Sequence, residues 1–129
     1  MEVSIDVADA LQEALNTAGH NASATPLPED FEDRLPFSRV ESLGGQRTQL
    51  VIDTFNIHID TWAETPAEAI AEANRVAAEL TELEGGRLDG SQVYSVALGS
   101  LPYEAEDPDH PSLPMASLMA QVAVRTRHV

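Results

Sequence analysis

The stretch between Gln46 and Gly86 constrains the fold more than any other part of the chain. Residues 46–62 predict an extended strand, and Thr65-Pro66-Ala67-Glu68 then predicts the start of a helix. The threonine hydroxyl can cap the helix, proline at the first helical position sacrifices no hydrogen bond, and the glutamate three residues later can reach back to the cap. An alanine-rich helix follows from Pro66 to about Glu84, and Gly85-Gly86 ends it. The sequence therefore predicts a long strand that leads directly into a helix.

The spacing of apolar residues predicts the remaining elements. Apolar residues at three- and four-residue steps predict an N-terminal helix from Ile5 to about Ala18, capped by Ser4 or Asp6. Alternating residues predict further strands at 37–42, 92–101 and 115–127. The prediction is one α+β domain spanning residues 1–129, with the order α-β-β-α-β-β. Its mixed or antiparallel sheet has about four strands, includes a long hairpin, and packs against two helices.

Two proline-rich acidic connectors and one irregular strand complete this prediction. Residues 21–36 and 101–114 are the connectors, and the first contains one amphipathic turn. Leu43-Gly44-Gly45 predicts the hairpin turn, which makes residues 46–62 the returning strand. At about 3.3 Å per residue that strand would span roughly 55 Å, so it should bend or project. Its apolar residues change from even to odd positions, which predicts a bulge near Asp53-Thr54.

The charge of the chain excludes several classes of function. Seven basic residues, all arginine, face 22 acidic residues, and the formal net charge is -15. Nucleic-acid binding depends on cationic side chains that displace counterions from phosphate, so we expect no general DNA or RNA binding and no charge-driven attachment to anionic lipid. The chain has no cysteine, which excludes disulfides and thiolate chemistry. We find no secretion signal and no apolar stretch of bilayer length, and expect a protein that is soluble and not secreted.

Two groups of residues could carry chemistry, but a simpler interpretation is favoured for both. Asn56, His58 and Asp60 share one face of a strand, where a histidine–carboxylate pair could transfer protons or bind a metal. A polar strand face that meets water or a neighbouring subunit explains the same alternation. Asp107-Pro108-Asp109-His110 offers metal ligands but lacks the glycine and distant glutamate of a calcium loop, so a solvated acidic loop is favoured. We therefore predict no catalytic, cofactor or metal site, and no enzyme.

Trp62, the single tryptophan, is predicted to lie in the core, with a partner contact as the alternative.

The layout of the chain resembles tail terminator proteins of long-tailed, siphovirus-type bacteriophages. The resemblance extends from about Ile5 to Arg127. It rests on the N-terminal helix, the connector before Gly44-Gly45, the strand that ends in Ile57-His58-Ile59-Asp60-Thr61-Trp62-Ala63, and the capped helix with Ala67-Glu68-Ala69. The acidic Asp107-Pro108-Asp109 loop and the final Arg125-Thr126-Arg127 continue it. Neck and head-completion proteins of similar size share parts of this layout.

The resemblance implies a structural virion protein that is assembled in the host cytoplasm and located in the neck region of the tail. Such proteins form a homohexameric ring on the head-proximal end of the tail tube, stop tube polymerisation and join the tail to the head-tail connector or stopper. The implied partners are copies of the chain itself, the major tail tube protein and the connector, and DNA only passes through the lumen. No membrane, cofactor or small-molecule substrate is implied. The predicted interface residues are Gly44, Gly45, Arg47, Phe55, Asp107, Asp109, Arg125 and Arg127.

Two alternatives remain at this point. The chain could be another neck or head-completion protein, or a small α+β ligand-binding or regulatory domain with a pocket on its sheet face. An enzyme ranks third. A pocket binder should have a concave apolar site with convergent polar groups. A ring subunit should instead present apolar and arginine side chains on surfaces that only the oligomer covers.

Overall fold

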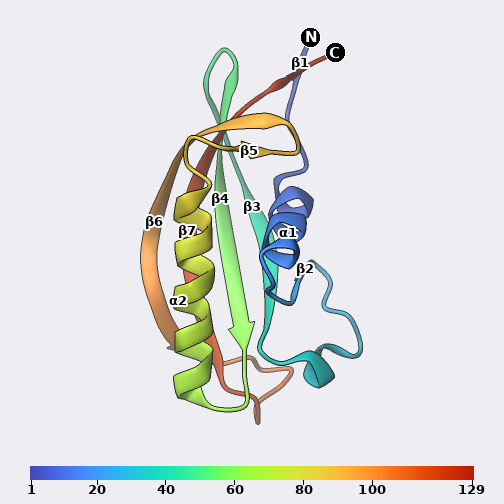
Figure 1. Cartoon of the computed structure of the whole chain (residues 1–129), viewed down its shortest axis with the longest axis vertical. Coiled ribbons are helices and arrows are strands. Elements are labelled where there is room, and N and C mark those ends of the chain that lie inside the picture. The colour runs from blue at the N-terminus through green and yellow to red at the C-terminus, as the bar shows by residue number, and fades with distance from the viewer.

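A six-stranded sheet forms the frame of the molecule in the computed structural model, which describes all 129 residues. The order across the sheet is β2 (Ala22–Ala24), β3 (Phe37–Gln49), β4 (Ile52–Trp62), β7 (Met115–Arg125), β6 (Ser91–Ala105) and β5 (Arg87–Leu88). Strand β2 runs parallel to β3, and every other neighbouring pair is antiparallel. A separate two-stranded ribbon pairs β1 (Glu2–Val3) with β8 (Arg127–His128) and brings the two termini together (Figure 1).

Both helices lie on the same face of the curled sheet (Figure 1). Helix α1 (Val7–Thr17) packs near β2 and β3, and helix α2 (Pro66–Glu82) crosses β4, β7 and β6. The predicted α+β class and the two helices are confirmed. The predicted sheet of about four strands and the simple order of elements are wrong, because the chain also forms β1, β2, β5 and β8. These strands have only two or three residues, too few to show an alternating pattern.

The two helix starts follow their capping residues. The Thr65 side chain accepts a hydrogen bond from the Glu68 amide at 3.1 Å, and Asp6 accepts one from the Asp9 amide at 3.2 Å. Each contact satisfies an amide that has no partner within its helix. The predicted cap at Thr65 and the Asp6 alternative for the first helix are therefore confirmed. Helix α2 ends at Glu82, two residues earlier than predicted.

The turn of the long hairpin lies six residues beyond the predicted position. Strand β3 continues through Gly44-Gly45 to Gln49, and Leu50-Val51 forms the turn. The pairing register with β4 shifts between Ser42 and Gly45, because Leu43 and Gly44 together face the single residue Asn56 and form a bulge within β3. The bulge predicted near Asp53-Thr54 lies instead in β3, where the register shifts again between Arg47, which pairs with Asp53, and Gln49, which pairs with Ile52. Leu50 belongs to the turn, so its apolar side chain does not mark a face of β4, and β4 keeps one phase of alternation throughout.

The strand before the second acidic connector is longer than predicted, whereas the strand after it, β7, ends at Arg125, two residues earlier than predicted. Strand β6 continues through Pro102 to Ala105, which shortens the loop between β6 and β7 to residues 106–114. The ladder between β6 and β7 is irregular at three places, and β5 pairs only with the start of β6. The remaining outer edge of β6 has no strand partner. A proline is tolerated there because no neighbouring strand needs its missing amide. The amphipathic turn predicted in the first connector corresponds to the 3-10 turn η1 (Phe31–Arg34).

Two apolar cores lie on opposite faces of β4. Ile57 and Ile59 point toward the helices and join the main core, which also contains Leu11, Val76 and Leu118. Trp62 points to the other face, where it packs with Phe31, Phe37 and Met115. The rings of Phe31 and Trp62 meet edge to face with centroids 5.4 Å apart. The predicted core position of Trp62 is confirmed, in a second core that the first connector covers.

Gly45 should tolerate no larger residue, because a Cβ atom there would lie 2.0 Å from the backbone oxygen of Thr54. We expect Gly45→Ala to lower the free energy of unfolding by about 1–3 kcal/mol, as over-packing typically does. Gly99→Ala is the matched control, since its Cβ would meet Met119 at an ordinary distance of 3.5 Å. Urea denaturation of both variants measures the difference. Equal stability of the two variants would contradict the bulge geometry.

Candidate assembly surfaces

The tip of the β3–β4 hairpin extends beyond the two cores. Every residue from Ser42 to Leu50 is exposed, including Leu43 and Leu50, and the Leu50 side chain is 88% exposed. Figure 1 shows the hairpin projecting past the helices at the end of the molecule where both termini lie. Strand β2 pairs only with residues 38–40 of β3, so the outer edge of β3 is unpaired beyond them. The hairpin thus presents both exposed leucines and free backbone groups.

The base of this hairpin is held by a bidentate ion pair. Arg47 donates from Nε to Asp53 Oδ1 at 2.7 Å and from Nη2 to Asp53 Oδ2 at 3.2 Å. Ser4 Oγ donates to the same carboxylate at 2.5 Å. The hydrogen bond from Arg47 holds the pKa of Asp53 below its ordinary value, although desolvation opposes this shift. Arg47, a predicted interface residue, therefore has a partner within its own subunit.

A second predicted interface residue, Asp107, anchors the acidic loop to the aromatic core. Its Oδ2 accepts from Trp62 Nε1 at 3.1 Å and lies 2.8 Å from His110 Nδ1, and its Oδ1 accepts from the Asp109 amide at 2.9 Å. The His110 ring in turn meets Phe31 edge to face. Desolvation is the largest single influence on the pKa of Asp107 and raises it, but the hydrogen bonds from His110, the Asp109 amide and Trp62 together lower it below its ordinary value.

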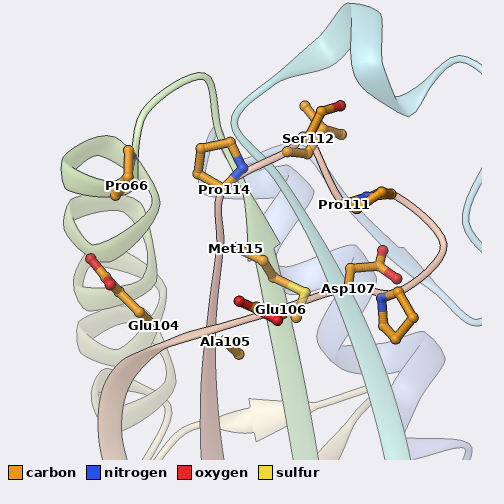
Figure 2. Close-up of a pocket in the computed structure, with 11 residues that line it drawn as sticks. Pro66, Glu104, Ala105, Glu106, Asp107, Pro111, Ser112, Pro114 and Met115 are labelled. Atoms are coloured by element: carbon orange, nitrogen blue, oxygen red, sulfur yellow. The ribbon is translucent and has the colours of Figure 1, made fainter.

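A hollow of about 550 Å³ lies beside this acidic loop (Figure 2). Its walls combine prolines with carboxylates, and Figure 2 shows Met115 extending toward Glu106 and Asp107. Asp109 is exposed nearby at the outer side of the loop. Acidic and proline side chains supply few hydrogen-bond donors, so this surface suits a cationic or donor-rich partner. The residues that line the hollow are Pro66, Glu104, Ala105, Glu106, Asp107, Pro108, Pro111, Ser112, Leu113, Pro114 and Met115.

The opposite end of the molecule carries a cationic hollow of about 500 Å³. Arg127 Nη2 donates to Asp89 Oδ2 at 2.6 Å, and Arg125 Nη1 donates to the Tyr94 hydroxyl at 3.3 Å. The Tyr94 hydrogen bond contributes most to raising the pKa of Arg125 above its ordinary value. We call this surface the arginine end, and its lining residues are Arg87, Asp89, Gly90, Ser91, Gln92, Arg125, Thr126, Arg127 and His128.

The polar strand face expected at residues 56–60 contains a connected network centred on Asp60. His58 Nε2 lies 3.1 Å from Asp60 Oδ1, and Arg39 Nη2 donates to Asp60 Oδ2 at 2.7 Å. Ser117 Oγ also donates to Asp60 Oδ1, at 2.5 Å. Asp60 is buried, and its three partners come from β3, β4 and β7. The network therefore links three strands, and its carboxylate oxygens are already occupied as acceptors.

The predicted interface residues separate into two groups at opposite ends of the molecule. Gly45, Arg47 and Phe55 line one shallow hollow at the base of the hairpin, with Gly44 adjacent in the chain. Phe55 is half-buried and packs against the main core. Arg125 pairs with Ile52 at the hairpin end of β4, and Arg127 pairs with Val3 beside the termini. Asp107 instead contacts Trp62 at the other end of β4, and Asp109 follows it in the loop. Sequence reasoning missed Ser4, Asp53, Arg87 and Asp89, whose contacts join segments that are far apart in the chain or depend on local turns.

Further features bear on what the chain can bind. No group of three or more histidine, aspartate or glutamate side chains gathers closely enough to hold a metal ion. Neither helix has the length and apolar character needed to cross a membrane.

Comparison with known proteins identifies a shared fold and no family. No protein-family model matches the chain. No curated protein matches it either. Among solved structures, the chain is similar to one in the virion of a native gene transfer agent particle, with a TM-score of 0.55 and 14% sequence identity. The similarity covers 89% of this chain and 84% of the other. At this identity the match shows that the two chains share a fold.

Asp53 should make the stability of the protein depend on pH in the acid range. Because its pKa is lower in the folded chain than the value of about 3.9 in the unfolded chain, it stabilises the fold above that value. This stabilisation is lost as the pH falls through the folded pKa. We expect Asp53→Asn to be less stable than the wild type at pH 7, with a difference that shrinks toward pH 2. Urea denaturation across this range measures it. Asp33→Asn serves as the control, because it removes one exposed charge that has no side-chain hydrogen bond. If the stability difference between Asp53→Asn and the wild type were the same at every pH, the lowered pKa of Asp53 would be contradicted.

Asp107→Asn should loosen the acidic loop. The asparagine side chain lacks the negative charge that strengthens the contacts of Asp107 with His110 and Trp62. Hydrogen bonds to charged groups contribute about 1.5–3 kcal/mol each. We expect a loss of unfolding free energy in this range and faster hydrogen exchange of the amides in the loop. Asp109→Asn, two residues away and exposed, should change the unfolding free energy by no more than about 0.5 kcal/mol and leave the hydrogen exchange of the loop unchanged. Equal effects of the two substitutions would show that Asp107 is not the anchor.

Proposed function

We propose that this chain is a structural virion protein that forms a homohexameric ring on the head-proximal end of a phage tail tube. In this proposal the ring stops tube polymerisation and joins the tail to the head-tail connector. The observation that carries it is the shared fold, over 89% of the chain, with a chain from the virion of a gene transfer agent particle. The resemblance to tail terminators in the layout of the sequence supplies the specific position in the tail.

The shape of the subunit supports an assembly role. The hairpin tip exposes Leu43 and Leu50 together with an unpaired strand edge, and none of these groups has a partner within the subunit. Exposed apolar side chains and free strand edges are favourable to bury against another chain. A ring arises when one patch of a subunit binds a different patch of the next subunit and the rotation closes. The hairpin is our proposed contact with the neighbouring subunit or the tube.

The proposal assigns the polar network around Asp60 a structural role, and assigns the chain no catalysis, cofactor or metal. Arg39 compensates the charge of a buried carboxylate that links three strands, and His58 lies 3.1 Å from the same carboxylate. The formal charge of -15 per copy also suits a ring that DNA passes through, because a negative lining repels phosphate instead of retaining it. Another position in the neck would use the same features, so the choice between terminator and other neck protein depends on the assembly assay.

The hollow beside the acidic loop favours a second candidate, a small ligand-binding domain. Its volume of about 550 Å³ lies within the range of small-molecule sites. Its prolines and Met115 provide apolar contact, and its carboxylates would select a cationic ligand. Native mass spectrometry of the purified protein tests this candidate. A retained small molecule that Glu106→Gln abolishes would support it and would count against a purely structural role.

The ring proposal predicts that the protein limits the growth of tail tubes. Added to polymerising tail-tube protein, it should produce tubes of reduced and uniform length in electron micrographs. Leu50→Asp should remove this effect and leave the unfolding free energy within about 0.5 kcal/mol of the wild type, because Leu50 is exposed. Ala67→Asp, on the exposed side of helix α2, adds the same charge and should still limit growth. Tubes that grow equally long with and without the wild-type protein would refute the tail-capping role.

A further inference from the structure

Charge is distributed unevenly between the two ends of the molecule. Four of the seven arginines lie at the end that holds the hairpin and the termini, namely Arg47, Arg87, Arg125 and Arg127. The acidic loop, with Glu106, Asp107 and Asp109, lies at the opposite end of the long axis, next to Glu104 at the end of β6 (Figure 1). A single copy therefore cannot bring its own arginine end and acidic loop together.

The arginine end has hydrogen-bond donors that nothing in the subunit fully uses. Arg87 bonds only to the Gly90 carbonyl and Arg125 only to the Tyr94 hydroxyl, so neither has a carboxylate partner in a chain with 22 acidic residues. Thr126 lines the same hollow, and its side-chain oxygen is buried without a hydrogen-bond partner. The residue as a whole is only 6% exposed.

These donors define the chemistry of the missing partner. Asp89 is the single carboxylate in the lining, and it already accepts from Arg127. The hollow is lined by guanidinium groups and a buried hydroxyl, which donate hydrogen bonds. A carboxylate suits such a site, because its two oxygens can accept two parallel hydrogen bonds from one arginine. The hollow contains no apolar residue, so a charged segment fits it better than an apolar one.

The acidic loop of another copy has the required chemistry and a fixed shape. Asp107 is bonded to Trp62 and His110, which holds the loop against the aromatic core before any partner arrives. Glu106 and Asp109 remain exposed beside this anchor. A segment that is already ordered loses less conformational entropy on binding than a flexible one. Copies with a charge of -15 repel each other elsewhere, so a contact where opposite charges meet favours their association.

We propose that the arginine end of one copy binds the acidic loop of the next copy. Carboxylates of Glu106 and Asp109 meet the guanidinium groups of Arg87 and Arg125, and Thr126 supplies a further hydrogen bond. The contact joins two different patches, which is the kind of interface that builds a ring. This inference rests on the proposed ring and names its interface.

Charge reversal at each end tests the contact by sedimentation velocity at low and high salt. Arg87→Glu with Arg125→Glu, or Glu106→Arg with Asp109→Arg, should each weaken self-association by about tenfold or more, because like charges then face each other. The two pairs combined in one chain should restore association, since opposite charges meet again with the signs exchanged. Association of the wild type should weaken with salt. Asp9→Arg with Glu13→Arg changes the net charge as much as the loop pair does, on helix α1, and should not weaken association.

The outcomes separate this contact from the ring itself. Association that is unaffected by both reversals would overturn the contact and leave the ring proposal standing on another surface. A combined variant that stays dissociated, or a wild type that remains monomeric at every concentration, would also overturn the contact. Retention on DNA at low salt that is lost only with Arg87→Glu and Arg125→Glu, without any change in self-association, would show that phosphate occupies the hollow and would overturn it too. The tube-length assay with the same variants reports on the ring independently.

Discussion

The unbroken pairing of β4 with β7 is the constraint on which the rest of the structure depends. The ladder runs from the Ile52–Arg125 pair to the Trp62–Met115 pair without a shift in register, whereas the ladders that flank it are both bulged. This regular pair occupies the middle of the six-stranded sheet, and we call it the central rib. The two bulged neighbours curl around this rib, and the helices cover one of its faces (Figure 1).

This rib also decides what each end of the molecule presents. At one end, Ile52 continues into the exposed hairpin, and Arg125 leads to the arginine end. At the other end, Trp62 and Met115 begin the aromatic core that holds the acidic loop. The apolar contacts of the core and the hydrogen bond from Trp62 to Asp107 thus place charged groups at a defined distance from the hairpin. The two surfaces proposed to mediate assembly are positioned by one element.

Acidic residues in this chain have two distinct uses. Asp53, Asp60 and Glu72 are buried, and each has a cationic or histidine partner that compensates the loss of water. The exposed carboxylates of the loop have no such partner within the subunit. The scarce arginines divide in the same way, because Arg39 and Arg47 stabilise the fold while Arg87 and Arg125 face outward without ion pairs. Net charge alone does not reveal this division, since it depends on which side chains the fold brings into contact.

The sequence by itself determined the elements whose signals are local. The hydroxyl and proline at Thr65-Pro66 fix a helix start through contacts within one turn, and the alternation in residues 115–125 predicts a strand at this position. Only the tertiary structure decided the hairpin turn, because Leu43-Gly44-Gly45 can form a turn or contain a bulge, and the pairing with β4 selects the bulge. The same holds for Arg47 and Asp107, which the sequence presents as free surface charges. Only the folded chain shows that Arg47 donates to Asp53 and that Asp107 accepts from Trp62. Pairings between segments distant in the chain depend on the packed core, and no local pattern specifies them.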